Sequence, residues 1–145
     1  PEARANWDMA DYMAVNKLGY NDHGMTHAII VSTNAIRIFD LLVQAGIKPD
    51  VVASGAGDED DACMAVAIAT LLHDIGNQVH RQFHELLGVG LARDLLDRLM
   101  PAVYPDATQR VELRAFILQA ILTHDFDPRP SRSRPPWWPW PTGRT

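Results

Sequence analysis

The chain has 145 residues, 47% of them apolar, which is enough to bury one hydrophobic core and too few for two ordinary domains. Its net charge of -5 provides no broad positive surface for nucleic acid or for an anionic membrane. The single cysteine excludes an internal disulfide, and no apolar run approaches the ~20 residues of a membrane span. These features predict one cytoplasmic domain with neither a nucleic-acid nor a membrane partner, and they leave the oligomeric state open.

Helical periodicity dominates the chain, and no alternating stretch of useful length predicts a strand. A short helix is expected from Trp7 to Leu18. The segment Thr26–Ala45 predicts a long helix with a narrow polar stripe, so we expect most of it to be buried. Gly46 and Pro49 end that helix, and a loop is expected from Ile47 to Gly57.

Three further helices are predicted in the second half. The acidic run 58–61 supplies a cap and favourable charge for an alanine-rich helix that ends at Leu72, and its small residues permit close packing. The next helix runs from about His80 to Met100, and the last begins at Asp106 and ends near His124. The predicted fold is therefore an all-α, compact helical bundle.

The composition changes abruptly near the C-terminus. Residues 128–145 alternate prolines and arginines with three tryptophans, and such a segment cannot continue a helix. The sequence therefore predicts a domain over residues 1–127 and a disordered or polyproline-type tail over residues 128–145.

The histidines supply the main functional signal. A lone histidine is more often structural than functional, but all six lie near expected helix ends. They form four clusters: His23 with His27, His73 beside Asp74, His80 with His84, and His124 beside Asp125. Imidazole and carboxylate are the usual ligands of divalent ions. The pattern predicts one or two ions of Mn, Fe, Mg, Co, Ni or Zn, and by itself it does not define the reaction.

The string His73-Asp74-Ile75-Gly76 resembles the HDIG signature of the HD superfamily of metal-dependent phosphohydrolases. The segment 22–27 resembles that family's first metal histidine and its lead-in. The segment 84–88 resembles the histidine-to-glycine element of its two-metal members, and His124 resembles the histidine that closes the next helix. These parts occur in the family's order and cover about residues 21–125.

The resemblance implies an HD-type bundle in which a metal-activated water hydrolyses the phosphate ester of a nucleotide or another small phosphorylated substrate. It assigns His73 and Asp74 to catalysis and gives five metal ligands: His27, His73, Asp74, His84 and His124. Asp74 would lie between two ions. Although His27 and Asp74 are distant in sequence, the ligating atoms of the first site are expected within about 5 Å of one another.

Three more residues are expected around the ligands. His80 and His23 are placed one step out, as substrate-phosphate contacts or as donors that orient the ligands, and His80 is also assigned to catalysis. Arg81 either neutralises a substrate phosphate or is a solvated arginine at a helix start.

Two features depart from the family's pattern. His124 is followed by Asp125-Phe126-Asp127-Pro128 where the cyclic-dinucleotide phosphodiesterases carry Gly-Tyr-Pro, so that substrate is not expected. The family also closes its first metal site with an aspartate on a last apolar helix, and residues 128–145 provide none. The alternatives are therefore a catalytically silent metal- or nucleotide-binding module and a defective product.

Residues 130–142 have a different meaning in another reading frame. Tryptophan has a single codon, so the nucleotide sequence of this segment can be partly reconstructed if its proline and arginine codons are taken to end in G. Translating that nucleotide sequence one base earlier gives Leu-Ala-Val-Glu-Ala-Ala-Val-Val-Ala-Val-Ala-Asp. This translation is an apolar helix that resembles the family's last helix, with its aspartate arising where the present frame gives Thr142. We therefore expect the tail to be a reading-frame accident and the 145-residue chain to be weakly active or inactive.

Overall fold

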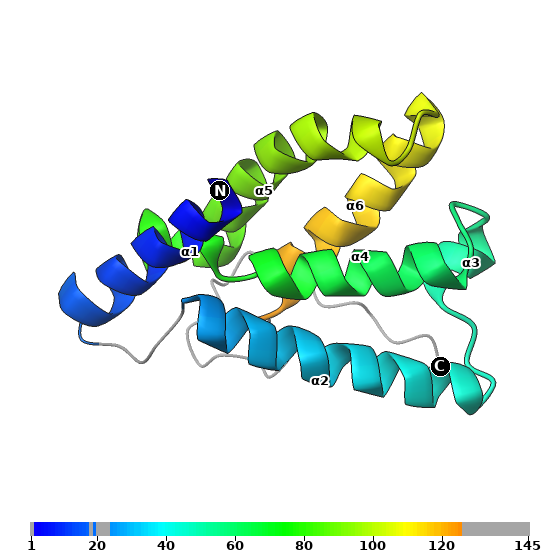
Figure 1. Cartoon of the computed structure of the whole chain (residues 1–145), viewed down its shortest axis with the longest axis horizontal. Helices are drawn as coiled ribbons and strands as arrows, with labels where there is room; N and C mark the ends of the chain where they lie inside the picture. The colour runs from blue at the N-terminus through cyan, green and yellow to red at the C-terminus, as the bar shows by residue number, and fades with distance from the viewer. Residues whose placement is uncertain (1, 18, 20–23, 126–145) are drawn as a thin grey trace, which may run out of the picture.

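The structure, a computed structural model, describes residues 2–17, 19 and 24–125 (Figure 1). It is an all-α bundle, as the sequence predicts, and no strand occurs in the described ranges. Its helices are α1 Glu2–Asp11, α2 Met25–Gln44, α3 Asp50–Ser54, α4 Glu59–Leu72, α5 His84–Leu99 and α6 Ala107–Thr123. A π-helical turn, Tyr12–Lys17, follows α1, and the 3-10 turns η2, Ile75–Gln78, and η3, Met100–Ala102, flank α5.

Helix α4 is the centre of the bundle. It packs against α2 and α6, and Figure 1 shows it running antiparallel to α2. Its N-terminus has a complete capping box, since the Asp58 carboxylate accepts from the Asp61 amide while the Asp61 carboxylate accepts from the Asp58 amide. The buried side chains of α4 are mostly alanines, which allow its neighbours to approach closely: Ala62, Ala65 and Ala69. The end of α4 therefore lies between other helices.

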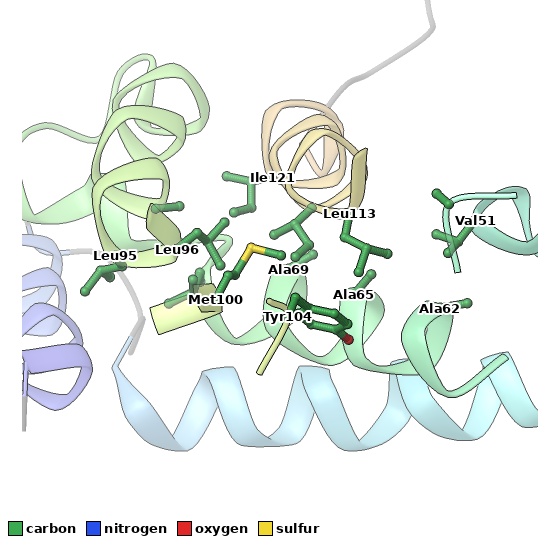
Figure 2. Close-up of a cluster of buried hydrophobic side chains, with 14 of the residues drawn as sticks. Val51, Ala62, Ala65, Ala69, Leu95, Leu96, Met100, Tyr104, Leu113 and Ile121 are labelled. Atoms are coloured by element: carbon green, nitrogen blue, oxygen red, sulfur yellow. The ribbon is translucent and has the colours of Figure 1, made fainter. Parts of the chain in front are cut away.

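The hydrophobic core lies where α4, α5 and α6 meet. Figure 2 shows Leu113 and Ile121 reaching from α6 into the cluster, with Ala65 on α4 and with Leu96 and Met100 on the side of α5. Leu113 is 2% exposed and Ile121 is 0% exposed. Burying a side chain of this size contributes about 1.5–3 kcal/mol. This core fixes the ends of α4, α5 and α6 relative to one another.

Helix α2 occupies the predicted residues, but its predicted burial is wrong. Only Ala28 and Ser32 are buried, whereas Ile30, Ile38 and Leu41 are 56%, 58% and 65% exposed. The reason is that α2 packs on α4 along one face, and the described part of the chain leaves the rest uncovered. By length and composition α2 could also cross a membrane, so the prediction that no apolar run reaches that length is wrong. Length and composition alone do not assign a membrane to it.

Other predicted boundaries differ from the observed ones. The first helix begins at Glu2 and becomes π-helical after Asp11, and the expected loop 47–57 contains the short helix α3. Helix α5 begins at His84 instead of about His80, because Phe83 has a φ of 65° and this left-handed conformation interrupts the helix. The predicted tail, residues 128–145, lies outside the described residues.

Candidate metal centre

Side chains from four helices meet at the C-terminal end of α4. His27 lies in the first turn of α2, His73 and Asp74 follow α4, His84 begins α5, and His124 follows α6. Ligating atoms lie within 4.8 Å of one another in two groups, His27 with His73 and Asp74, and Asp74 with His84 and His124. The predicted convergence of the first group is therefore confirmed, and the two groups are called the first and second triads below.

Asp74 belongs to both triads. Its Oδ2 atom lies 3.0 Å from Nε2 of His73 and 3.3 Å from Nε2 of His27. Its Oδ1 atom lies 3.2 Å from Nε2 of His84 and 3.7 Å from Nε2 of His124. The buried carboxylate thus directs one oxygen to each triad, which is the arrangement that a carboxylate shared by two cations requires.

Backbone carbonyls orient three of the four imidazoles. The Nδ1 atoms of His73, His84 and His124 lie 2.7, 3.0 and 2.7 Å from the carbonyl oxygens of Thr70, Arg81 and Ile121, respectively. A carbonyl oxygen only accepts hydrogen bonds, so each Nδ1 carries the proton and donates it. In a neutral ring this leaves Nε2 as an acceptor that faces Asp74. Ring orientation of this kind is typical of histidines that bind metals.

The Nε2 atoms approach one another in pairs. Those of His27 and His73 are 3.3 Å apart, and those of His84 and His124 are 3.1 Å apart. His84 and His124 both donate Nδ1–H to a carbonyl, so in neutral rings their facing Nε2 atoms are both acceptors and repel unless a proton or a cation lies between them. A tetrahedral ion with metal–nitrogen distances of about 2.0–2.1 Å separates its ligand nitrogens by about 3.3 Å. Both the donor types and their spacing therefore fit a divalent cation.

The electrostatics of Asp74 agree with this geometry. Burial alone would raise the pKa of Asp74, but the imidazoles of His124, His73 and His84, whose Nε2 atoms donate to the carboxylate when the rings are protonated, outweigh burial and hold the pKa well below its usual range. Burial lowers the pKa of His124, but its bonds with Asp74 and with the Ile121 carbonyl raise the pKa by more, so the net pKa is raised. The ionised carboxylate thus draws positive charge to the imidazoles, in the form of protons or of a metal ion.

Gly76 allows the second triad to form. The turn η2 packs against the first turns of α5, and a Cβ atom at Gly76 would overlap the carbonyl oxygen of His84 and lie 2.6 Å from the amide nitrogen of Gly88. Any side chain at residue 76 would push η2 away from α5, and it would therefore move Asp74 away from His84. A Cβ at Gly88 would meet only ordinary contacts at 3.5 Å, so the close approach depends on Gly76.

Two residues near the site carry no role in the sequence-based prediction. Asn77 is 1% exposed, and its Nδ2 atom donates to Oδ1 of Asp74 at 2.9 Å, which fixes the carboxylate. The sequence does indicate Asn77, because this polar residue lies one helical turn after Asp74 in a mostly apolar segment. Asp125 lies 3.6 Å from Arg81 and forms a third carboxylate–imidazole group with His84 and Glu85.

The outer residues predicted from the resemblance lie in different places. His80 is exposed, its Nδ1 atom accepts from the Gln82 amide, and it lies outside both triads. Arg81 lies in the site, close to Asp74, His84 and Asp125, so its description as a solvated arginine is wrong. His23 lies outside the described residues. The substrate contacts of these residues stay predictions.

A groove leads to the first triad. A cavity of about 280 Å³ opens beside His27, His73 and His124, and a second cavity of about 390 Å³ shares its lining residue Ala120. Helix α4 forms the floor, α2 and α6 form the walls, and the start of α3 closes the far end. The apolar and small lining residues are Val31, Phe39, Pro49, Val51, Ala62, Ala65, Val66, Ala69, Phe116 and Ala120. The groove thus continues from the metal centre along most of α4.

The second triad provides a test of metal stoichiometry. We expect His84→Ala to lower the number of Mn²⁺ ions bound at saturation from two per chain to one, because it removes one of three ligands. Equilibrium dialysis measures this number, and thermal unfolding shows how far the buried ring also supports the fold. His80→Ala is the matched control, since that histidine lies outside both triads. Equal Mn²⁺ content in His84→Ala and the parent would contradict a second site.

The chain is similar to an uncharacterized protein of Methanocaldococcus jannaschii. The two are 39% identical over 116 residues, which is 80% of this chain and 44% of that protein. The chain therefore spans less than half the length of this relative. No protein-family model matches the sequence, and no solved structure matches the chain.

Proposed function

We propose that the chain hydrolyses the phosphate ester of a nucleotide or another small phosphorylated substrate with a metal-activated water. One observation carries the proposal: four imidazole side chains and the buried Asp74 carboxylate converge in two triads whose ligating atoms lie within 4.8 Å of one another. Such a set is costly to bury without a cation. A divalent cation held there lowers the pKa of a water molecule to about 7 and neutralises phosphate charge, which supplies the chemistry of ester hydrolysis.

The chain's own residues would hold and orient this centre. His27, His73 and Oδ2 of Asp74 would bind the first cation. Oδ1 of Asp74, with His84 and His124, would bind the second. The carbonyl bonds to Nδ1 keep Nε2 of His73, His84 and His124 directed inward, and the Asn77 amide keeps the carboxylate from rotating. The ligand geometry is thus formed before a substrate arrives.

The resemblance to the HD superfamily supports the reaction class. The segment 73–76 carries the signature, and in the structure it ends α4 and begins η2 beside three other histidines. A metal site alone is equally compatible with a silent binding module, so the reaction class rests on this resemblance. The proposed partner is a small phosphorylated substrate, and the proposed cofactor is one or two divalent ions.

The test combines metal analysis with a substrate screen on one preparation. We expect the purified chain to contain at least one transition-metal ion, and expect any release of phosphate from phosphomonoesters or nucleotides to stop with EDTA and to return with Mn²⁺. Metal binding without hydrolysis of any substrate would favour the silent module. A preparation that binds no divalent ion at any concentration would remove the basis of the proposal.

A further inference from the structure

Arg81 lies against the second triad. It stands in the turn between η2 and α5, and its side chain is 29% exposed. Its Nη1 atom lies 3.0 Å from Nε2 and 3.3 Å from Nδ1 of His84. An atom in the ring plane would approach one ring nitrogen only, so the guanidinium lies over the face of the imidazole, a common arrangement for arginine.

The same guanidinium lies next to the position where a cation of the second triad would bind. Nη1 is 3.8 Å from Oδ1 of Asp74, the carboxylate oxygen that faces His84 and His124. It also contacts Oδ1 of Asn77 at 3.4 Å. Arginine does not lose its proton in proteins, so it carries a full positive charge here. A divalent ion among these atoms would lie within a few ångströms of that charge and would be repelled by it.

A place for the displaced guanidinium exists nearby. The Nη2 atom of Arg81 lies 3.6 Å from Oδ2 of Asp125, a carboxylate that is 56% exposed and is adjacent in sequence to His124. The arginine side chain is long and reaches solvent, so it is able to turn toward Asp125 without moving the backbone of η2. The first triad meets Asp74 through the other oxygen, Oδ2.

We propose that Arg81 is the internal counter-ion of the second triad and that a second divalent ion binds there only by displacing the guanidinium toward Asp125. This inference rests on the metal centre of the proposed function. It makes the two triads unequal: the first fills at low metal concentration, and the second fills only when the metal outcompetes Arg81. The displaced guanidinium then stands at the edge of the centre, with donors suited to a phosphate group.

The test uses Mn²⁺ as the probe on the full chain. Isothermal titration calorimetry gives the affinity of each ion, and electron paramagnetic resonance reports spin coupling between two adjacent Mn²⁺ ions. We expect Arg81→Met to bind the second ion about tenfold or more tightly than the parent, because a unit charge is removed within about 4 Å. The affinity of the first ion should change by much less. The spin-coupled signal should then appear at lower total Mn²⁺.

Matched variants separate charge from shape. Arg81→Gln is a second neutral variant and should give the same gain, while Arg81→Lys keeps the charge and should give a smaller one. Arg93→Met is the control, because Arg93 is an exposed arginine of α5 that pairs with Asp97 away from the triads. Circular dichroism checks that each variant is folded. The test requires only one of the two neutral variants, Arg81→Met or Arg81→Gln, to fold.

The outcomes separate this inference from the proposed function. Tighter binding of the second ion in the neutral variants, with no change in Arg93→Met, supports it. An unchanged affinity for the second ion, or a single bound ion in both the parent and the neutral variants, overturns it and leaves the first triad and the proposed reaction intact. Failure of the parent to bind Mn²⁺ at all overturns both.

Discussion

Replacing Asp74 with asparagine is expected to lower phosphohydrolase activity at least about a thousandfold, on the order of 4 kcal/mol of transition-state stabilisation. The substitution keeps the shape of the side chain, but it removes the only carboxylate that both triads share. It also places an amide group, which is half donor, among acceptor nitrogens. The variant should therefore lose both cations rather than one, in contrast to His84→Ala.

Thermal unfolding gives a readout of this variant that does not depend on finding the substrate. Mn²⁺ is expected to raise the Tm of the parent, because a ligand that binds only the folded state stabilises it. Asp74→Asn should show no rise at the same concentrations. Asp94→Asn, an exposed carboxylate on α5, is the matched control and should behave like the parent. A metal-dependent rise in the Tm of Asp74→Asn would place the cation elsewhere in the chain.

The helices follow from local features of the sequence, whereas the expected ligand set follows from the resemblance to the HD superfamily. Helix α4 begins at the acidic cap Asp58 and ends where His73 begins the signature, and α6 begins with Asp106, whose side chain accepts from the Gln109 amide. These signals act over three or four residues, so a single sequence shows them. The convergence of His27 with Asp74 was expected because the resemblance assigns both residues to one metal site.

Features that depend on the path of the backbone were not predictable in this way. The left-handed conformation of Phe83 shifts the start of α5, so His80 does not share a helix face with His84, and Arg81 turns back over the ring of His84. No residue type near Phe83 indicates this conformation, which bulky side chains rarely adopt. The shifted start of α5 and the observed positions of His80 and Arg81 thus share one local cause.

The exposure of α2 was not predictable either, for a different reason. Its apolar residues lie almost all round the helix, so periodicity does not show which side faces the core. In the structure Val31 lines the groove beside His27, and Ile38 and Leu42 continue along the same side of α2 at helical spacing, both more than 40% exposed. The described residues thus leave an apolar wall along a groove that ends at the first triad.

This groove bears on the reading-frame hypothesis for residues 130–142. The alternative translation is rich in alanine and valine and ends in aspartate, and small apolar side chains suit a floor made of Ala62, Ala65 and Ala69. A helix in the groove would lead toward His27 and His73. The sequence hypothesis and the groove are independent of each other, since the first comes from codons and the second from the described helices.

Replacing residues 130–142 with the alternative translation is therefore expected to raise Mn²⁺ affinity at the first triad about tenfold or more, because an additional carboxylate ligand becomes available. Phosphohydrolase activity and the Tm should rise with it. The same chain with its new aspartate changed to asparagine is the control, which should keep the gain in Tm from apolar burial and lose the gain in affinity. Sequencing the source gene shows which frame it encodes. A confirmed present frame, with full activity in the 145-residue chain, would refute the hypothesis, because the first triad would then need no further ligand.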